Sequence, residues 1–185
     1  MVKEHIIELN IDLVFKFESL RLKNISCNQN DNLIFEHYFW KEIFAVWINV
    51  ILSENEFSNL SNLKLKNPNF SLSFEIIDDE LIADLNKKWL NKNGPTDVLS
   101  FPIISENDLY NQIPCIELGD LFISIETAQR QAIKYNNSLQ EEMIWLASHG
   151  FLHLLGWDHH DKNELDKMLN FQEFLISKLN KIQKI

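Results

Sequence analysis

Residues 149–160 read His149-Gly150-Phe151-Leu152-His153-Leu154-Leu155-Gly156-Trp157-Asp158-His159-His160, and they contain four of the six histidines of this chain. Residues four apart project from one face of an α-helix, one turn from each other, so His149 and His153 can point at the same ion. A glycine such as Gly156 can end that helix in a left-handed conformation and turn the chain back. The reversal lets His159 supply a third nitrogen. This stretch therefore predicts a three-histidine metal site at the end of a helix.

Three protein ligands leave one coordination position of a zinc ion open, and this open position distinguishes catalytic zinc sites from closed structural ones. His160 is adjacent to His159, so the two rings cannot easily point the same way, and we expect His160 to lie outside the ligand set. The sequence thus predicts one zinc ion per chain, held by His149, His153 and His159. Imidazole also suits copper, iron and nickel, so the ligand type alone leaves the identity of the metal open.

The histidine spacing equals that of the metzincin motif H-E-x-x-H-x-x-G-x-x-H, in which the glutamate serves as general base. In this chain the position of the glutamate is taken by Gly150, which cannot accept a proton. The pattern therefore predicts a metal cradle of the metzincin type without the protease machinery. A hydrolase acting on peptides or small molecules is a disfavoured alternative for the same reason.

Length and composition favour one globular domain spanning residues 1–185, because 45% of the residues are hydrophobic and thirteen are phenylalanine. The longest apolar run, 43–52, is too short to cross a bilayer, and no signal-peptide pattern is evident. Cys27 and Cys115 are isolated, which favours a reducing cytoplasm. The net charge of −10 argues against indiscriminate nucleic-acid binding, although a local basic groove is compatible with it.

The order of predicted elements indicates an α+β fold, with a small mixed sheet packed against several helices, because strands and helices mix early and helices alone follow. Alternating apolar residues and turn signals predict strands at 6–17, 69–77, 97–104 and 118–125. Pro102 suits an edge strand better than a central one. Capping patterns and apolar periodicity predict helices at 33–52, 78–90, 126–135, 138–155 and from 161 to the C-terminus, with loops at 22–32 and 53–69.

Three blocks of sequence carry a resemblance to a known family. The segment H-G-x-L-H-L-x-G-x-D-H at 149–159 resembles the signature of the YbeY family of bacterial endoribonucleases, also called rRNA maturation factors. A second block, P-T-D-V-L-S-F-P, is unbroken at 95–102, and a third, L-G-D, is present at 118–120. Trp157 stands where the family more often has tyrosine. The order and spacing of the blocks are similar to those of the family from about residue 6 to the C-terminal helix.

The resemblance implies a zinc-dependent endoribonuclease, a hydrolase specific for single-stranded RNA, which acts in 16S rRNA 3′-end maturation and ribosome quality control in the cytoplasm. The implied partners are the 16S rRNA precursor and the ribosome or its small subunit, with no DNA and no membrane. The alternative is a ribosome-assembly factor whose zinc site is mainly structural and whose cleavage is weak or absent. The sequence assigns no general base and predicts no oligomeric state.

One position departs from the family pattern. Family members often carry Tyr-Arg between the L-N of the preceding helix and the P-T-D block, where this chain has Trp89-Leu90. The resemblance implicates that arginine in RNA handling or catalysis, and leucine cannot replace it. Lys87, Lys88 and Lys92 could supply positive charge, but a lysine lacks the bidentate fork of a guanidinium. The departure favours the assembly-factor alternative.

Several polar residues could support the metal site. Asp97, Asp120 and Asp158 are candidate partners for the second N–H group of a metal-bound histidine, or turn and cap residues. Ser100 reads as a strand residue, and Met168 could lie under the site or simply pack in its helix. Aromatic residues that we expect in the core, and not on an RNA-stacking surface, are Phe35, Tyr38, Phe39, Phe44 and Trp47.

Overall fold

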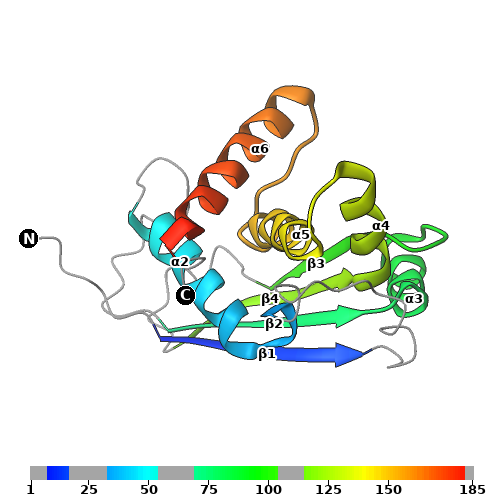
Figure 1. Cartoon of the computed structure of the whole chain (residues 1–185), viewed down its shortest axis with the longest axis horizontal. Coiled ribbons are helices and arrows are strands. Elements are labelled where there is room, and N and C mark those ends of the chain that lie inside the picture. The colour runs from blue at the N-terminus through cyan, green and yellow to red at the C-terminus, as the bar shows by residue number, and fades with distance from the viewer. Residues whose placement is uncertain (1–7, 17–32, 54–68, 104–114, 182–185) are drawn as a thin grey trace, which may run out of the picture.

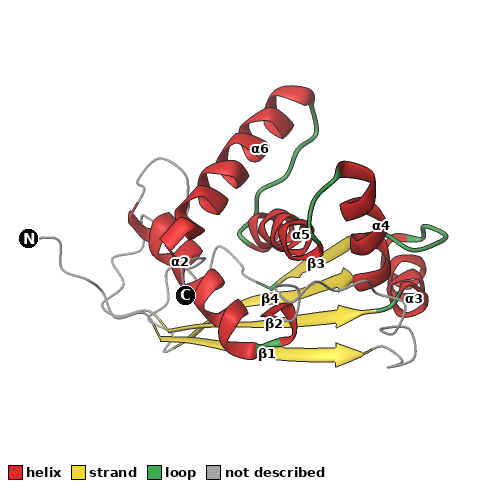
Figure 2. Ribbon diagram, in the orientation of Figure 1, coloured by secondary structure: helices red, strands yellow, loops and turns green. Residues whose placement is uncertain are grey.

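The computed structural model describes residues 8–16, 33–53, 69–103 and 115–181. Within these ranges helices and strands alternate early and helices follow late, so the predicted α+β class is confirmed (Figure 2). The elements are β1 (Glu8–Lys16), α2 (His37–Ser53), β2 (Asn69–Ile77), α3 (Asp79–Leu90), β3 (Val98–Pro102), β4 (Cys115–Ser124), α4 (Ile125–Tyr135), α5 (Leu139–Leu154), α6 (Lys162–Ser177) and the short 3-10 helix η2 (Lys178–Lys181).

The four strands form one mixed sheet in the order β1-β2-β4-β3. Strands β1, β2 and β4 are parallel, whereas β3 runs antiparallel to β4 and lies at the edge, as Pro102 predicted. Opposite Pro102 stands Gly119, whose φ is +127° and where a Cβ would lie 2.2 Å from the Phe101 carbonyl oxygen. The pairing register of β2 with β4 shifts next to this glycine. The L-G-D block therefore marks a bulge that only glycine fits.

The main core fills the space between one face of the sheet and the helices α2, α5 and α6. Strand β2 alternates buried and partly buried side chains, which aims Phe70, Leu72 and Phe74 at this core. The Phe44 ring of α2 lies 5.6 Å from the ring of Phe74 and 5.4 Å from that of Phe151 in α5. Figure 1 shows α5, in yellow, between the sheet and α6. Helix α5 is therefore held from both sides.

Helix α3 covers part of the opposite face, where a smaller buried cluster contains Ile77, Ile82 and Leu99. The helix begins at Asp78, whose side chain accepts a hydrogen bond from the Leu81 amide at 2.9 Å. It ends at Asn91, whose φ of 56° is left-handed. This packing holds the last turn of α3 beside the edge strand β3.

The structure corrects several sequence-based expectations. Tyr38 is not a core residue, because 57% of it is exposed, whereas Phe39, Phe44 and Trp47 are buried. Tyr38 lies in the first turn of α2, which begins at His37 after a 3-10 turn at 33–35 and not at residue 33. The predicted loop 22–32 and the C-terminal end of the last apolar stripe lie outside the described residues. Among the helices described, none combines the length and apolarity needed to cross a membrane.

Candidate metal centre

Helix α5 places His149 and His153 on one face because they are four residues apart, and a capping box fixes the start of the helix. The Ser138 hydroxyl accepts a hydrogen bond from the Glu141 amide at 3.1 Å, and the Glu141 carboxylate accepts one from the Ser138 amide at 2.8 Å. This is the capping box that the sequence predicted. From there the helix runs without interruption through both histidines to Leu154.

The chain turns back directly after α5. Gly156 adopts a φ of +84°, as predicted, and its amide donates to the His153 carbonyl at 3.0 Å. The Asp158 carboxylate then accepts a hydrogen bond from the His159 amide at 2.8 Å, which also lowers the pKa of Asp158. Helix α6 begins at Lys162, and the Asp161 carboxylate before it accepts a hydrogen bond from the Glu164 amide. These local bonds bring His159 back over the end of α5.

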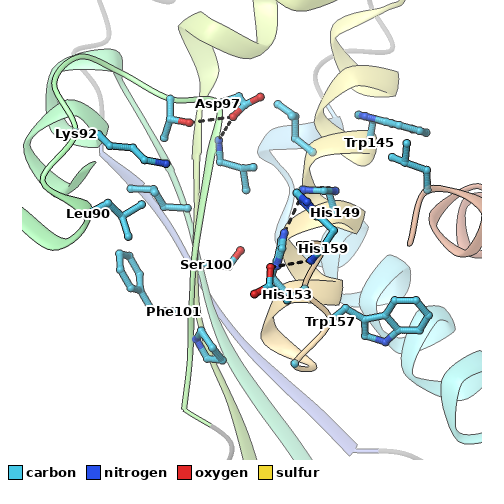
Figure 3. Close-up of a pocket in the computed structure, with 18 residues that line it drawn as sticks. Leu90, Lys92, Asp97, Ser100, Phe101, Trp145, His149, His153, Trp157 and His159 are labelled. Atoms are coloured by element: carbon cyan, nitrogen blue, oxygen red, sulfur yellow. Dashed lines mark hydrogen bonds between the residues drawn. The ribbon is translucent and has the colours of Figure 1, made fainter. Parts of the chain in front are cut away.

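The three imidazoles converge on one point (Figure 3). The His149 ring centroid lies 4.8 Å from that of His153 and 5.8 Å from that of His159, and one ring nitrogen of each residue lies within 4.8 Å of the others. His160 does not join them: its side chain is 81% exposed and lies 3.4 Å from Asp158. The structure thus brings together the three predicted ligands and leaves out His160, and the group could hold a metal ion.

A hydrogen bond to Gln172 defines which nitrogen of the His149 ring faces the group. The Gln172 amide nitrogen donates to the Trp145 carbonyl at 2.9 Å, so its amide oxygen must be the atom that faces His149. That oxygen lies 3.2 Å from Nδ1 of His149, which therefore carries the proton. His153 forms a hydrogen bond with the Trp157 backbone that favours the protonated ring, as a bond to a carbonyl does. In the neutral His149 ring Nε2 therefore carries the lone pair.

The Nε2 atoms of His149 and His153 lie only 3.2 Å apart. Two imidazole nitrogens can face each other at this distance when a proton or a metal cation lies between them. Zinc–nitrogen bonds of about 2.0 Å in a tetrahedral site separate the ligand nitrogens by about 3.3 Å, so the observed spacing fits a metal ion. The donor chemistry and the geometry of the group therefore agree.

The protonation equilibria of both rings favour metal binding. Burial, followed by the proximity of His153, lowers the pKa of His149 below its ordinary value of 6.5. Burial also lowers the pKa of His153, although its bond to the Trp157 backbone opposes the shift. Because a metal binds the neutral imidazole, protons compete with the metal less here than at an exposed histidine.

We expect the metal-free protein to lose stability as the pH falls below about 6.5. Both folded-state pKa values lie below the ordinary value, so unfolding takes up protons in this range and the stability present at neutral pH is lost on acidification. Urea midpoints measured between about pH 7.5 and pH 5 test this. His149→Gln should reduce the fall, whereas His160→Gln, at an exposed position, should not. If the urea midpoint of His149→Gln fell with pH as steeply as that of the wild type, His149 would not be a source of the loss of stability.

Sequence reasoning missed Gln172 as the residue that orients His149. Gln172 is fully buried on the core-facing stripe of α6, between Met168 and Leu175. The apolar positions of this helix repeat at intervals of three and four, and position 172 falls in the repeat although its residue is polar. A polar side chain at a core position is buried only with hydrogen-bond partners. A glutamine within the apolar stripe of α6 was therefore the feature of the sequence that could have indicated a buried hydrogen-bonding role.

The three candidate aspartates do not bond to the imidazoles. Asp97 accepts from the Val98 amide and from Gln131, each at 2.9 Å, which ties the start of β3 to α4. Its negative charge acts on His149 only at a distance, by opposing the fall of the pKa. Asp158 stabilises the turn, and Asp120 pairs with Phe101 in the sheet. Each therefore has a turn or strand role, and Met168 is buried in the main core.

Gly150 marks the closest approach of α5 to the sheet. A Cβ at this position would lie 2.3 Å from Leu121 Cδ1 and 2.9 Å from both Ser100 Oγ and Val98 Cγ2. Ser100 lies in strand β3, as predicted, and its hydroxyl donates to the Gly150 carbonyl at 3.0 Å. The position that holds the general base in metzincins therefore faces β3 and β4, where a side chain has no room.

A cleft of about 880 Å³ contains the histidines. Edge strand β3 runs along it, with Leu90 and Lys92 on one side of the strand and the three imidazoles on the other (Figure 3). Trp145 and Trp157 line the side of α5. The residue that departs from the family pattern, Leu90, thus lines the same cleft as the histidines.

Comparisons with known proteins agree with the family resemblance of the sequence blocks at 95–102, 118–120 and 149–159. A family model described as Endoribonuclease YbeY matches residues 24–180. A protein named Endoribonuclease YbeY from Prochlorococcus marinus subsp. pastoris is 54% identical over 181 residues, which cover 97% of this chain and 100% of the relative. One of the same name from Synechococcus sp. (strain CC9902) is 43% identical over 77% of this chain and 79% of the relative. The solution structure of TM1509 from Thermotoga maritima aligns over 92% of each chain with 19% identity and a TM-score of 0.47.

Proposed function

This chain belongs to the YbeY family of endoribonucleases, and on that premise we propose that it is a zinc-dependent enzyme that cleaves single-stranded RNA. We further propose that it acts in the cytoplasm as one domain spanning residues 1–185, in 16S rRNA 3′-end maturation and ribosome quality control. The observation that carries this proposal is the convergence of three imidazoles inside an open cleft. The ribosome or its small subunit would be the partner.

We propose that His149, His153 and His159 hold one zinc ion per chain. The two opposed Nε2 atoms at 3.2 Å and the lowered pKa values of both rings support this ligand set. A bound zinc ion would lower the pKa of a water molecule and polarise a phosphate oxygen. Gln172 and the Trp157 backbone orient the two rings of α5, and Lys92 carries the positive charge along the cleft. We assign no residue as general base.

The alternative is a ribosome-assembly factor with a mainly structural zinc site. Leucine at position 90 and the net charge of −10 favour it, because both reduce the attraction for phosphate. The accessibility of the site favours the enzyme, since structural zinc sites are closed by four protein ligands. Among the described residues the metal-ligating group has three members and lines a cleft.

Cleavage by the purified protein distinguishes the two functions. We would incubate it with a single-stranded RNA that spans the 3′ end of a 16S precursor, and with duplex RNA and single-stranded DNA of the same sequence as controls. The proposal requires cleavage of the single-stranded RNA that a chelator stops and added zinc restores. RNA binding without cleavage at any metal concentration would favour the assembly factor, and cleavage that resists chelation would exclude the metal's role.

Removing the amide that orients His149 should weaken metal binding. Gln172→Leu fills the buried position with an apolar side chain of similar size but removes the oxygen that accepts from Nδ1 of His149. Loss of such a partner typically costs roughly 10–100-fold in metal affinity. Competition with a chromophoric zinc chelator measures the change. Gln172→Glu retains an acceptor oxygen and should bind zinc more tightly than the leucine variant. Wild-type affinity in a folded Gln172→Leu protein would show that the amide does not support the site.

A further inference from the structure

An exposed tryptophan directly precedes Leu90, which lines the cleft. Trp89, in the last turn of α3, is 60% exposed, and its neighbour Leu90 is 48% exposed. Trp40 and Trp47, in contrast, are fully buried, so exposure is not the rule for tryptophan in this chain. Large apolar side chains that gather on a surface mark binding sites more often than isolated ones do. Trp89 and Leu90 therefore present exposed apolar surface next to the cleft.

The indole continues an aromatic surface that enters the cleft. The ring of Trp89 lies 5.9 Å from that of Phe101, and Phe101 lines the cleft that contains the histidines. In Figure 3 Phe101 lies beside Leu90, across strand β3 from His149 and His153. We call Trp89 and Phe101 the aromatic platform. A ligand that stacks on this platform would lie next to the cleft that contains the imidazoles.

Positive charge accompanies the platform. The Lys88 ammonium lies over the indole of Trp89, 5.2 Å from the ring centroid, and Lys92 lines the cleft. Neither ammonium is paired with a carboxylate among the residues that the structure describes. In a chain with a net charge of −10, unpaired cations next to exposed rings are complementary to an anionic ligand with planar groups. A single-stranded nucleic acid has both properties.

We propose that the aromatic platform stacks one nucleobase of a single-stranded RNA while Lys88 and Lys92 bind the flanking phosphates. This proposal rests on the proposed RNA cleavage and names how the strand is held. Bases in a duplex are already stacked within it, whereas unpaired bases can lie on aromatic side chains. The platform therefore selects single strands, while Lys88 and Lys92 supply part of the phosphate binding that the leucine at position 90 does not provide.

Affinity for a short fluorescent single-stranded RNA tests the platform in the zinc-loaded full-length protein, with the RNA checked on a gel for integrity. Trp89→Ala should weaken binding by roughly tenfold, and Trp89→Phe should retain most of the affinity. The matched control is Tyr135→Ala, which removes another exposed ring with a lysine over it, 4.9 Å from its centroid, outside the cleft. That variant should bind as the wild type does.

Abasic RNA and the salt dependence of binding distinguish the contribution of base stacking to affinity from that of phosphate binding. An RNA series with one abasic nucleotide at successive positions should reveal one position at which the wild type loses affinity and Trp89→Ala loses none. Trp89→Ala should leave the salt dependence of binding unchanged, whereas Lys92→Ala should lower the slope by about one phosphate contact.

Three results would overturn the platform. They are unchanged affinity in Trp89→Ala, equal loss in Tyr135→Ala, and a wild type that is insensitive to every abasic position. The last result needs no substitution, so it holds even if a variant misfolds. If the wild-type protein binds no RNA at all, the proposed function fails together with the platform; if it binds RNA and only Trp89 proves indifferent, the proposed function stands.

Discussion

His153→Ala is expected to release the zinc ion and to abolish RNA cleavage while the fold is retained. His153 contributes one of three converging nitrogens, and its Nε2 lies 3.2 Å from that of His149. Loss of a mere supporting residue typically costs roughly 10–100-fold in metal affinity, so loss of a direct ligand should cost more than that.

Metal content and cleavage must be measured on the same preparation. Elemental analysis should find about one zinc per chain in the wild type and little in His153→Ala, and cleavage of the single-stranded RNA should fall with it. His160→Ala is the matched control, because its exposed ring lies against Asp158 and outside the group. Zinc loss in His160→Ala with retention in a His159→Ala protein would place the turn after Gly156 one residue out of register.

Local patterns accounted for the ligand cradle because its parts are close in sequence. His149 and His153 share a helix face by periodicity alone, and Gly156 reverses the chain at the predicted residue with a φ of +84°. The capping patterns at Ser138 and Asp161 likewise depend on side chains three residues apart. Such features are readable without knowledge of the rest of the fold.

Features that depend on distant pairing could not be read in this way. Strand β4 begins at Cys115, ahead of the predicted residue 118, because its first residues pair with the start of β2. The Gln172 contact with His149 joins residues on two different helices. Lys92 and Leu90 share a cleft with the histidines only because α3 packs beside β3. Spacing along the chain carries no information about these contacts.

Gly150 is a residue whose chemical consequence could be read from the sequence but whose structural reason could not. From the sequence it was clear that glycine cannot act as the general base of a metzincin, but not why glycine stands there. In the structure this position faces the sheet, where a Cβ would lie 2.3 Å from Leu121 Cδ1. Leu121 is fully buried, so its side chain has little room to move away. The glycine is explained by close packing between helix and sheet and not by the chemistry of the metal site.

Gly150→Glu is therefore expected to unfold the protein or to lift α5 off the sheet, although it recreates the metzincin motif. Gly150→Ala gains about 1 kcal/mol of helix propensity but costs roughly 1–3 kcal/mol in overpacking, so its net effect should be small and destabilising. A glutamate adds the burial of a polar or charged group, which costs several kcal/mol more, against a total stability of about 5–15 kcal/mol.

Chemical denaturation should show that the wild type is the most stable, Gly150→Ala slightly less stable and Gly150→Glu the least stable. Ile133→Glu is the matched control, since it introduces the same carboxylate on a helix at a residue that is 75% exposed, and its midpoint should stay near that of the wild type. Zinc content should fall with the fold in Gly150→Glu, because α5 carries two of the three histidines, and no peptidase activity should appear. A folded Gly150→Glu protein with the wild-type midpoint would mean that α5 does not approach β3 and β4 this closely.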